Sequence, residues 1–226
     1  MPFSRTVALL GHDAMERIFS SRVFVFSVGG VGGWCAEALA RTGVGSIAIV
    51  DDDVVAPSNV NRQVMATSAT IGRPKVEVLA ERLREINPDI AVEAYQKRFC
   101  ADTEHFFADK MRNCDAVVDA IDSLDEKHRL IRLCEKHGEF LVSSMGAALR
   151  TDPTCVKISA FTDVTGDPIA RALRNRFRHD ELGTLPLFLC VHSTEPPRKC
   201  EELGSFMPVT ATFGMTLASL ALGLIH

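Results

Sequence analysis

A glycine-rich stretch near the start of the chain, Ser27–Gly33, constrains the fold more than any other feature. It joins an apolar segment typical of a buried strand, Arg22–Val28, to a segment with helical periodicity, Val31–Thr42. In such a unit Gly29 lets the backbone approach a phosphate and Gly32 lets the helix pack closely on the strand, while the helix N-terminus faces the anion. The stretch therefore predicts a strand–turn–helix unit that binds a nucleotide.

The residues around this unit qualify the prediction. Ser27 occupies the position where the dinucleotide-binding fingerprint has its first glycine, and a serine fits there if its φ angle is negative. The next strand, Ser46–Val50, ends at Asp51, at about the 20-residue distance where such units carry the acid that binds a ribose. Asp51 is therefore the predicted ribose ligand, with a solvated turn acid as the structural alternative.

The polar residues that follow Asp51 indicate what happens to the nucleotide. One loop contains Asn59, Arg62 and Gln63, and Gly72–Lys75 opens the next helix. Because the strand ends of an open parallel sheet meet at one crevice, these side chains are expected to lie close together. Arg and Lys suit a triphosphate. A dehydrogenase needs no such cluster, so the set favours attack on an α-phosphate over hydride transfer.

Two of the charged positions have structural explanations as well. Lys75 lies in a first helical turn, where a cation opposes the helix dipole, and a nearby phosphate would remove this conflict. Asp122 follows the predicted strand Asp115–Asp119 and suits Mg²⁺, which binds phosphates together with one or two carboxylates. Asp122 would also suit a cap of the helix that starts near Ser123, and the two roles are compatible.

Alternating strand-like and helical segments predict an α/β fold: a doubly wound, Rossmann-like, mostly parallel sheet with helices on both faces. The expected helices cover His12–Ser20, Val31–Thr42, Pro74–Ile86, Thr103–Met111, Ser123–His137 and Asp167–Arg178. The expected strands cover Arg22–Val28, Ser46–Val50, Ile90–Tyr95, Asp115–Asp119, Phe140–Ser144, Leu187–His192 and, at an edge, Cys155–Phe161. We expect one domain over residues 1–226, with a nucleotide-binding core of about residues 20–145 and a small C-terminal extension, residues 146–226.

Composition narrows the cellular setting. The seven cysteines form no C-x-x-C pair and no disulfide framework, which indicates a reducing cytoplasm and argues against a Cys₄ zinc site. Cys35, Cys114, Cys134 and the single tryptophan, Trp34, fall in regular patterns and are expected in the core. The apolar run Val209–Ile225 is short for a membrane span, so we expect a buried or dimer-interface helix; peripheral membrane association stays open.

Taken together and in order, the motifs of the first 145 residues resemble those of the ThiF/MoeB/ubiquitin-activating superfamily, which uses ATP to adenylate carboxylates. The family patterns are G-x-G-G-[VL]-G, D-x-D-x-V-x-x-S-N-x-x-R-Q, G-x-x-K and D-x-x-D. The chain matches the second from Asp51, the third at Gly72 and the fourth at Asp119, and departs from the first only at Ser27. The resemblance therefore implies an ATP-dependent adenylating enzyme.

The resemblance also implies roles for single residues. Gly30 would lie against the ATP, and Asp51 would hold the ribose. The phosphates would be contacted by Asn59, Arg62 and Lys75. Asp122 would hold Mg²⁺. Arg5 matches an arginine that this superfamily extends across its dimer interface into the neighbour's site, so a homodimer is implied.

Motifs in the second half of the chain resemble one branch of this superfamily, the tRNA threonylcarbamoyladenosine dehydratases. They are Ser144–Ala147, Asp152–Thr154, Gly166–Ala170, Ser193–Glu195, Gly204–Phe206 and Val209–Gly214. The resemblance implies that the enzyme uses ATP to cyclise the threonylcarbamoyl side chain on the adenosine beside the tRNA anticodon, through an acyl-adenylate. A sulfur-transfer or redox protein would be a further partner.

Two other functions stay open as alternatives. An adenylyltransferase for the C-terminus of a ubiquitin-like sulfur carrier would use the same motifs, but the missing zinc cysteines and the second-half motifs count against it. A catalytically reduced nucleotide-binding scaffold would account for Ser27. The retained charged residues that oppose this scaffold are Arg5, Arg62, Lys75 and Asp122.

An RNA substrate needs a local basic surface, because the net charge of the chain is −4. The helix expected over Asp167–Arg178 is the densest basic stretch and places three arginines on one face. These are Arg171, Arg174 and Arg178, which Arg176, Arg198 and Lys199 would extend. In the same loop as Lys199, Cys200 is interpreted as an exposed, inert thiol, with a nucleophile as the alternative.

Overall fold

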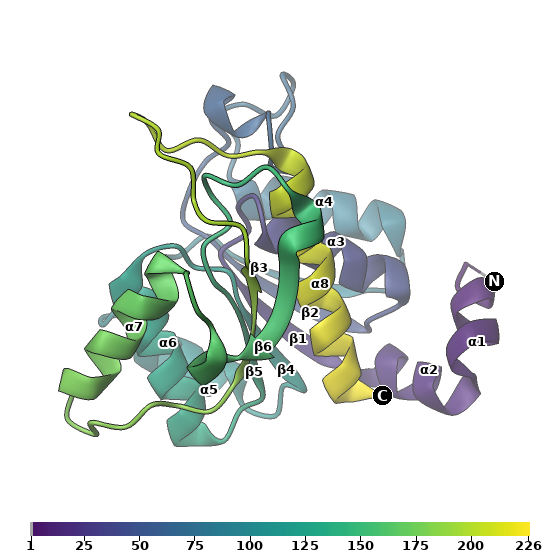
Figure 1. The fold of residues 1–226 in the computed structure, drawn as a ribbon. Helices are drawn as coiled ribbons and strands as arrows, with labels where there is room; N and C mark the ends of the chain where they lie inside the picture. Colours follow the sequence, from purple (N-terminus) through teal and green to yellow (C-terminus); the bar gives the residue numbers. More distant parts are fainter. Residues whose placement is uncertain (1) are drawn as a thin grey trace.

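One seven-stranded sheet organises the computed structural model, which describes residues 2–226 (Figure 1). The strands are β1 (Arg22–Phe26), β2 (Ser46–Val50), β3 (Ala91–Tyr95), β4 (Ala116–Asp119), β5 (Leu141–Ser144), β6 (Val156–Ala160) and β7 (Leu189–Ser193). They lie in the order β3-β2-β1-β4-β5-β7-β6, and every neighbouring pair is parallel except β7 and β6. The predicted doubly wound, mostly parallel sheet is confirmed, with β6 at an edge.

Helices cover both faces of this sheet. They are α1 (Ser4–Leu10), α2 (His12–Ser20), α3 (Gly32–Thr42), α4 (Lys75–Ile86), α5 (Glu104–Met111), α6 (Leu124–His137), α7 (Pro168–His179) and α8 (Met207–Ile225). Short 3₁₀ turns cover Pro57–Asn59, Pro153–Cys155 and Phe161–Asp163. The sequence prediction missed α1; the other helices lie within a few residues of their predicted bounds.

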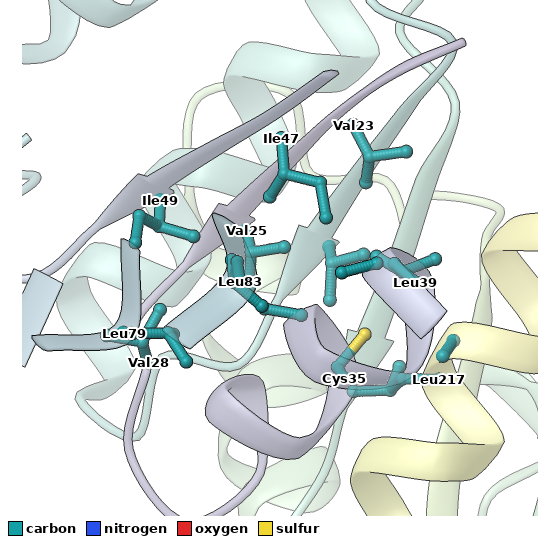
Figure 2. Packing of buried hydrophobic residues seen from close by; sticks show 14 of the residues in the cluster. Val23, Val25, Val28, Cys35, Leu39, Ile47, Ile49, Leu79, Leu83 and Leu217 are labelled. Atoms are coloured by element: carbon teal, nitrogen blue, oxygen red, sulfur yellow. The ribbon is translucent and has the colours of Figure 1, made fainter. Parts of the chain in front are cut away.

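The side chains of β1 show why helices are needed on both faces. Four consecutive residues of this strand are fully buried, and successive side chains of a strand point to opposite faces. One face packs with α3, α4 and α8, through Val23, Val25, Leu39, Leu83 and Leu217 (Figure 2). The other face packs with α5 and α6, through Phe24, Phe26, Phe107 and Leu130.

The apolar C-terminal run forms α8, which is long and apolar enough to cross a membrane, with a mean hydropathy of 1.6. One side of the helix is nevertheless part of the core: Phe213, Leu217 and Ala221 are fully buried. α8 also lies very close to α3, because a Cβ atom at Gly214 would come within 2.5 Å of the Val31 carbonyl oxygen. The opposite side exposes Met215. The predicted buried helix is therefore present, with one apolar face toward the outside.

The sheet topology fixes where a ligand can bind. β1 lies between β2 and β4, so the chain winds outward in both directions from this strand. Ligands of doubly wound sheets bind at this switch point, outside the carboxyl ends of the strands. In Figure 1 the loops after β1, β2 and β5 gather at this edge, whereas α1 stands apart from it, beyond α2, which lies beside the C-terminal end of α8.

Candidate nucleotide-binding site

A crevice of about 660 Å³ opens at the carboxyl ends of β1, β2 and β4, within the range of about 300–1,000 Å³ of small-molecule sites. Most of the residues predicted from sequence to bind the nucleotide or a metal line it. They are Gly29, Gly30, Asp51, Asn59, Arg62, Lys75 and Asp122. Gly32 and Arg5 do not line it. Arg5 is exposed on α1, apart from the strand ends (Figure 1).

The glycine turn differs from the prediction at Ser27. Its φ angle is +67°, not negative, so the serine adopts the left-handed conformation that the fingerprint glycine would take. β1 consequently ends at Phe26, two residues before the predicted end. A Cβ atom at Gly32 would lie 1.9 Å from the Ser27 carbonyl oxygen, whereas one at Gly29 would meet nothing closer than 3.8 Å. Gly32 therefore permits helix–strand packing, and Gly29 leaves open space toward the crevice.

The loop after the 3₁₀ turn Pro57–Asn59 packs directly on the glycines of the turn after β1. A Cβ atom at Gly30 would lie 3.2 Å from Cγ of Arg62, and one at Gly33 would lie 2.9 Å from Cε of Met65. Trp34 donates a hydrogen bond from Nε1 to the Arg62 carbonyl oxygen, at 3.0 Å. Sequence reasoning placed Trp34 in the core, but it is half-buried and holds this loop. The glycines thus make room for the loop as well as for a phosphate.

Arg62 and Asn59 carry hydrogen-bond donors that are not bound to a carboxylate of the described residues. Nη1 of Arg62 donates to the Ser58 carbonyl oxygen at 2.8 Å and to Oδ1 of Asn61 at 3.0 Å, and no ion pair forms on it within residues 2–226. Oδ1 of Asn59 accepts the Ala56 N–H at 2.9 Å, which stabilises the 3₁₀ turn. The guanidinium group and the Asn59 amide NH₂ are therefore the groups that this loop offers to an anion.

Asp51 and Lys75 form the floor beside β2. Oδ2 of Asp51 accepts the Val28 N–H at 2.9 Å, and burial raises the pKa of this carboxyl against the opposing Lys75 ammonium. Nζ of Lys75 lies 2.6 Å from Oδ2 of Asp53 and 3.8 Å from Oδ1 of Asp51. The expected conflict of Lys75 with the helix dipole is thus relieved by carboxylates, so the position of this lysine does not by itself require a phosphate.

Asp122 lies after β4 as an exposed crevice residue. Ser123 is the N-cap of α6, and Asp122 forms no hydrogen bond within the described chain. The capping role considered for Asp122 is therefore wrong. The three consecutive acids Asp51–Asp53 also bring carboxylate oxygens within 4.8 Å of one another.

A buried ion pair beneath the crevice was missed by sequence reasoning. Nζ of Lys127 lies 2.7 Å from Oδ2 of Asp119, and both side chains are fully buried. The ammonium also donates to Oγ of Ser143 and to the Ser144 carbonyl oxygen, at 3.3 and 2.9 Å. Oδ1 of Asp119 accepts the Ile121 N–H at 3.0 Å, which shapes the turn before Asp122. Lys127 thereby ties the ends of β4 and β5 to α6.

The far wall of the crevice, Gly146–Ala148, is held by a second buried ion pair. Nη2 of Arg150 lies 2.9 Å from Oδ2 of Asp167, and the same carboxylate accepts the Gly146 N–H at 3.2 Å. Nε of Arg150 donates to the Glu195 carbonyl oxygen at 3.0 Å. The Glu195 carboxylate accepts the backbone N–H groups at positions 151 and 152, and these hydrogen bonds lower its pKa. Four of the second-half motifs thus meet in one network.

The predicted basic face of α7 is thinner in the structure. Arg171 and Arg178 are exposed and have no ion pair within residues 2–226. Arg174 is half-buried and donates to the Phe161 carbonyl oxygen at 3.1 Å, and Arg176 pairs with Asp125. Two of the arginines are therefore engaged by the protein itself.

The cysteines lie as the sequence indicated. Cys35, Cys114 and Cys134 are buried, and burial raises the pKa of Cys114 to about 12. Cys200 is exposed in the loop between β7 and α8. This loop is fastened beside the crevice, because the Leu149 N–H donates to the Gly204 carbonyl oxygen at 2.9 Å.

Comparisons with known proteins agree on the kind of molecule to which this chain is similar. The model of the ThiF family matches residues 3–226. The tRNA threonylcarbamoyladenosine dehydratase of Bacillus subtilis is 42% identical over 178 residues, which cover 79% of this chain and 69% of that protein. Its Escherichia coli counterpart is 34% identical over 248 aligned positions, covering 97% of this chain and 91% of that protein. A crystal structure of the E. coli enzyme in complex with ATP superposes with a TM-score of 0.92 at 36% identity, over 98% of this chain and 92% of that one.

Proposed function

The chain belongs to the ThiF family, and from this premise we propose that it is an ATP-dependent tRNA threonylcarbamoyladenosine dehydratase. One observation carries the proposal: the residues expected around ATP converge on one crevice, although they come from three separate loops and the start of α4. The far wall of that crevice is built from the second-half motifs that resemble this branch. The dehydratase of E. coli, similar in fold over nearly the whole chain, binds ATP.

The reaction has two steps, in which ATP is a substrate. A carboxylate oxygen of the threonylcarbamoyl group attacks the α-phosphorus in line, and pyrophosphate leaves. An oxygen or nitrogen of the same side chain then attacks the activated carbonyl carbon and expels AMP, so the substrate has lost the elements of water. Most of the catalysis comes from positioning the reactants and neutralising charge.

In this proposal each of the predicted site residues that line the crevice has a task. The Asp51 carboxylate, which is buried at the end of β2, accepts hydrogen bonds from the ribose hydroxyls. Arg62, which lies over Gly30, binds the phosphates together with Lys75 and stabilises the charge that develops on them. The Asn59 amide donates to a phosphate oxygen. We treat residues 1–226 as one adenylating domain, because β6 and β7 of the second half complete the same sheet.

Charge balance supports a role for Mg²⁺. The crevice is lined by four cationic residues, of which Lys75 pairs with Asp53 and Arg98 with Glu126, at 2.6 Å each. The remaining two are Arg62 and Lys97. A triphosphate carries more negative charge than these two cations balance. Asp122 has a carboxylate without a partner in residues 2–226, and this group suits Mg²⁺. The ion would hold Asp122 and phosphate oxygens together and neutralise part of their charge.

In this proposal Arg5 of a second copy of the chain completes the crevice. Arg5 is exposed on α1 and lies outside the crevice of its own chain. We expect Arg5→Ala and Asp122→Ala to be inactive separately and to recover partial activity when mixed, because one heterodimer site is then intact. No recovery after subunit exchange has been verified by mass spectrometry would show that Arg5 does not act across an interface.

The tRNA would contact α7 and the loop beside the crevice. Arg171 and Arg178 are exposed arginines of α7 that form no ion pair within the described chain. Contacts of such arginines bind phosphates, so the affinity for tRNA falls steeply with salt. Changing both to Glu should weaken tRNA binding and flatten its salt dependence while the KM for ATP stays unchanged. An unaltered dependence of tRNA affinity on salt would mean that the RNA binds elsewhere on the protein.

Because one side of α8 packs in the core, we place the enzyme in the cytoplasm.

The test of the proposed function is the release of pyrophosphate and of AMP from ATP with three candidate substrates. They are tRNA that carries threonylcarbamoyladenosine, the same tRNA without the modification, and a ubiquitin-like sulfur carrier. We expect turnover only with the modified tRNA, together with a mass loss of one water from the modified base. Turnover with the carrier alone would make the chain a carrier adenylyltransferase, and no turnover with any of the three would favour a scaffold.

A further inference from the structure

Gln63 is a buried polar side chain that faces the crevice and has an unmet hydrogen-bonding group. Its side chain is 6% exposed and lines the crevice beside Arg62. Its Oε1 has no hydrogen-bond partner anywhere within residues 2–226. Its Nε2 points toward the glycine turn, 3.8 Å from the place that a Cβ atom of Gly29 would take. The sequence motif contains this residue, but none of the tasks above uses it.

The orientation of Gln63 is fixed by its surroundings. Its backbone N–H donates to the Asn59 carbonyl oxygen at 2.9 Å, and its own carbonyl oxygen accepts the Ala66 N–H at 3.0 Å. The residue before it is held by Trp34, and Met65 packs on Gly33. A buried acceptor without a partner is costly, and native structures keep such groups mainly where a ligand or water completes them. The amide is therefore presented to whatever occupies the space above Gly29.

The chemistry of the ligand decides what Oε1 can bind. Phosphate and carboxylate oxygens only accept hydrogen bonds, so they can pair with Nε2 but not with Oε1. The ribose hydroxyls are taken by Asp51 at the end of β2. The remaining donors next to the reacting atoms are the threonyl hydroxyl and the N–H group that flanks the threonyl carboxylate in the carbamoyl linkage, and a substrate methylated at this N–H distinguishes the two. One amide can thus face an anion and an adjacent N–H at the same time.

We propose that Gln63 selects and orients the substrate: its Oε1 accepts the N–H next to the threonyl carboxylate, while its Nε2 donates to an α-phosphate oxygen. This inference rests on the proposed function and names the part of the substrate that the loop with Arg62 and Gln63 recognises. The carboxylate is thereby held in line with the α-phosphorus. An acid that lacks an N–H at this position leaves Oε1 unpaired and is rejected.

The test combines a protein variant with a substrate analogue. Gln63→Met keeps the length of the side chain but removes both polar ends; the only other glutamine, Gln96, is exposed outside the crevice, and Gln96→Met is the matched control. The substrates are anticodon stem-loop RNAs that carry threonylcarbamoyladenosine or its derivative methylated at the N–H beside the carboxylate. The readout is pyrophosphate release, because this step precedes ring closure and does not consume the N–H.

We expect the wild-type protein and Gln96→Met to lose about 10-fold to 100-fold in kcat/KM on the methylated RNA, the range of one buried hydrogen bond. Gln63→Met should show a loss of this size already on the natural RNA, with little further loss on the methylated one. Full discrimination between the two RNAs retained by Gln63→Met would overturn the inference.

A second variant separates this inference from a folding defect and from failure of the proposed function. Gln63→Glu keeps the acceptor but replaces the donor by a negative charge, so it should still discriminate between the two RNAs while turning over more slowly. Loss of that discrimination would count against the assigned pairing. Absence of wild-type turnover on the natural RNA would instead contradict the proposed function itself.

Discussion

The two walls of the crevice are built in opposite ways. The first wall, residues 27–75, is a nearly continuous piece of chain in which a glycine turn, Asp51 and the Arg62 loop pack on one another. The second wall, Gly146–Ala148, depends on Arg150, Asp167 and Glu195, which are distant in sequence. Beside the paired Lys75, the first wall presents the Arg62 guanidinium group, which has no ion pair within residues 2–226, and the unpartnered Oε1 of Gln63, whereas the buried charges of the second wall are paired. Groups left without partners are available for ligands, and paired groups hold the shape.

This difference predicts that substitutions in the second wall lower the free energy of unfolding. Arg150→Met leaves the fully buried Asp167 carboxylate without its cation. Breaking a buried pair on one side costs about 3–5 kcal/mol, and urea unfolding should show a loss of this size. Arg198→Met is the control, because this side chain is 63% exposed and 4.0 Å from Glu195. Equal stability of the two variants would contradict the assignment of Arg150 as the support of this wall.

Damage to the first wall should affect catalysis while sparing stability. Arg62→Met removes a guanidinium group that has no carboxylate partner, so the free energy of unfolding should change by less than about 0.5 kcal/mol. Adenylation should fall about 100-fold to 1,000-fold, because a charge-stabilising donor at a transition state contributes about 2.7–4 kcal/mol. Arg73→Met, which loses only a surface pair with Glu81, should retain activity. A large stability loss in Arg62→Met would remove the contrast between the walls.

Within the first wall, Gly32 is needed for packing, whereas Gly29 is expected to matter for ligand binding. In Gly32→Ala the new methyl group would collide with the Ser27 carbonyl oxygen, so thermal unfolding should show a loss of about 1–3 kcal/mol. In Gly29→Ala the methyl group meets no protein atom within 3.8 Å. That variant should keep its stability but bind ATP about tenfold more weakly, as measured by calorimetry. Tight ATP binding by Gly29→Ala would mean that no phosphate approaches this position.

The same contrast explains what could be predicted from the sequence. Apolar strand-like runs that alternate with helical segments predicted the sheet, and the glycines and the polar residues after Asp51 predicted the first wall, because each signal lies within about thirty residues of its effect. Lys127 and Arg150 could not be predicted in this way. A lysine on an amphipathic helix resembles any solvated lysine until the end of β5 is placed beside it. The left-handed Ser27 was missed because the close approach of Gly32 is a property of the packed unit, not of either residue.

A smaller effect is expected from strain in the two walls. Ser27 in the first wall has a φ angle of +67° and Leu149 beside the second has +62°. Since the left-handed region costs an ordinary residue about 1–2 kcal/mol and glycine loses more chain entropy, Ser27→Gly should stabilise the protein by about 0.5–1 kcal/mol. Leu149→Gly gains less, because its half-buried side chain is lost. Calorimetric melting compares the two; a lower Tm for Ser27→Gly would mean that the serine hydroxyl supports the turn.

The smallest effect concerns pH and distinguishes the walls by sign. In the second half, burial lowers the pKa of His192 below its ordinary value of 6.5, with Asp167 opposing the shift and Arg150 adding to it. Nε2 of His192 lies 2.9 Å from Oγ of Ser159, and Nδ1 has no partner within residues 2–226.

As pH falls through 6.5 the unfolded chain takes up a proton that the folded chain resists, so stability contributed by neutral His192 is lost. Burial of Asp51 raises its pKa, so acidification relieves rather than penalises that wall. The difference in unfolding free energy between the wild-type protein and His192→Gln should therefore shrink from pH 7.5 to pH 5.5. A constant difference would mean that His192 titrates in the folded protein as it does in the unfolded chain.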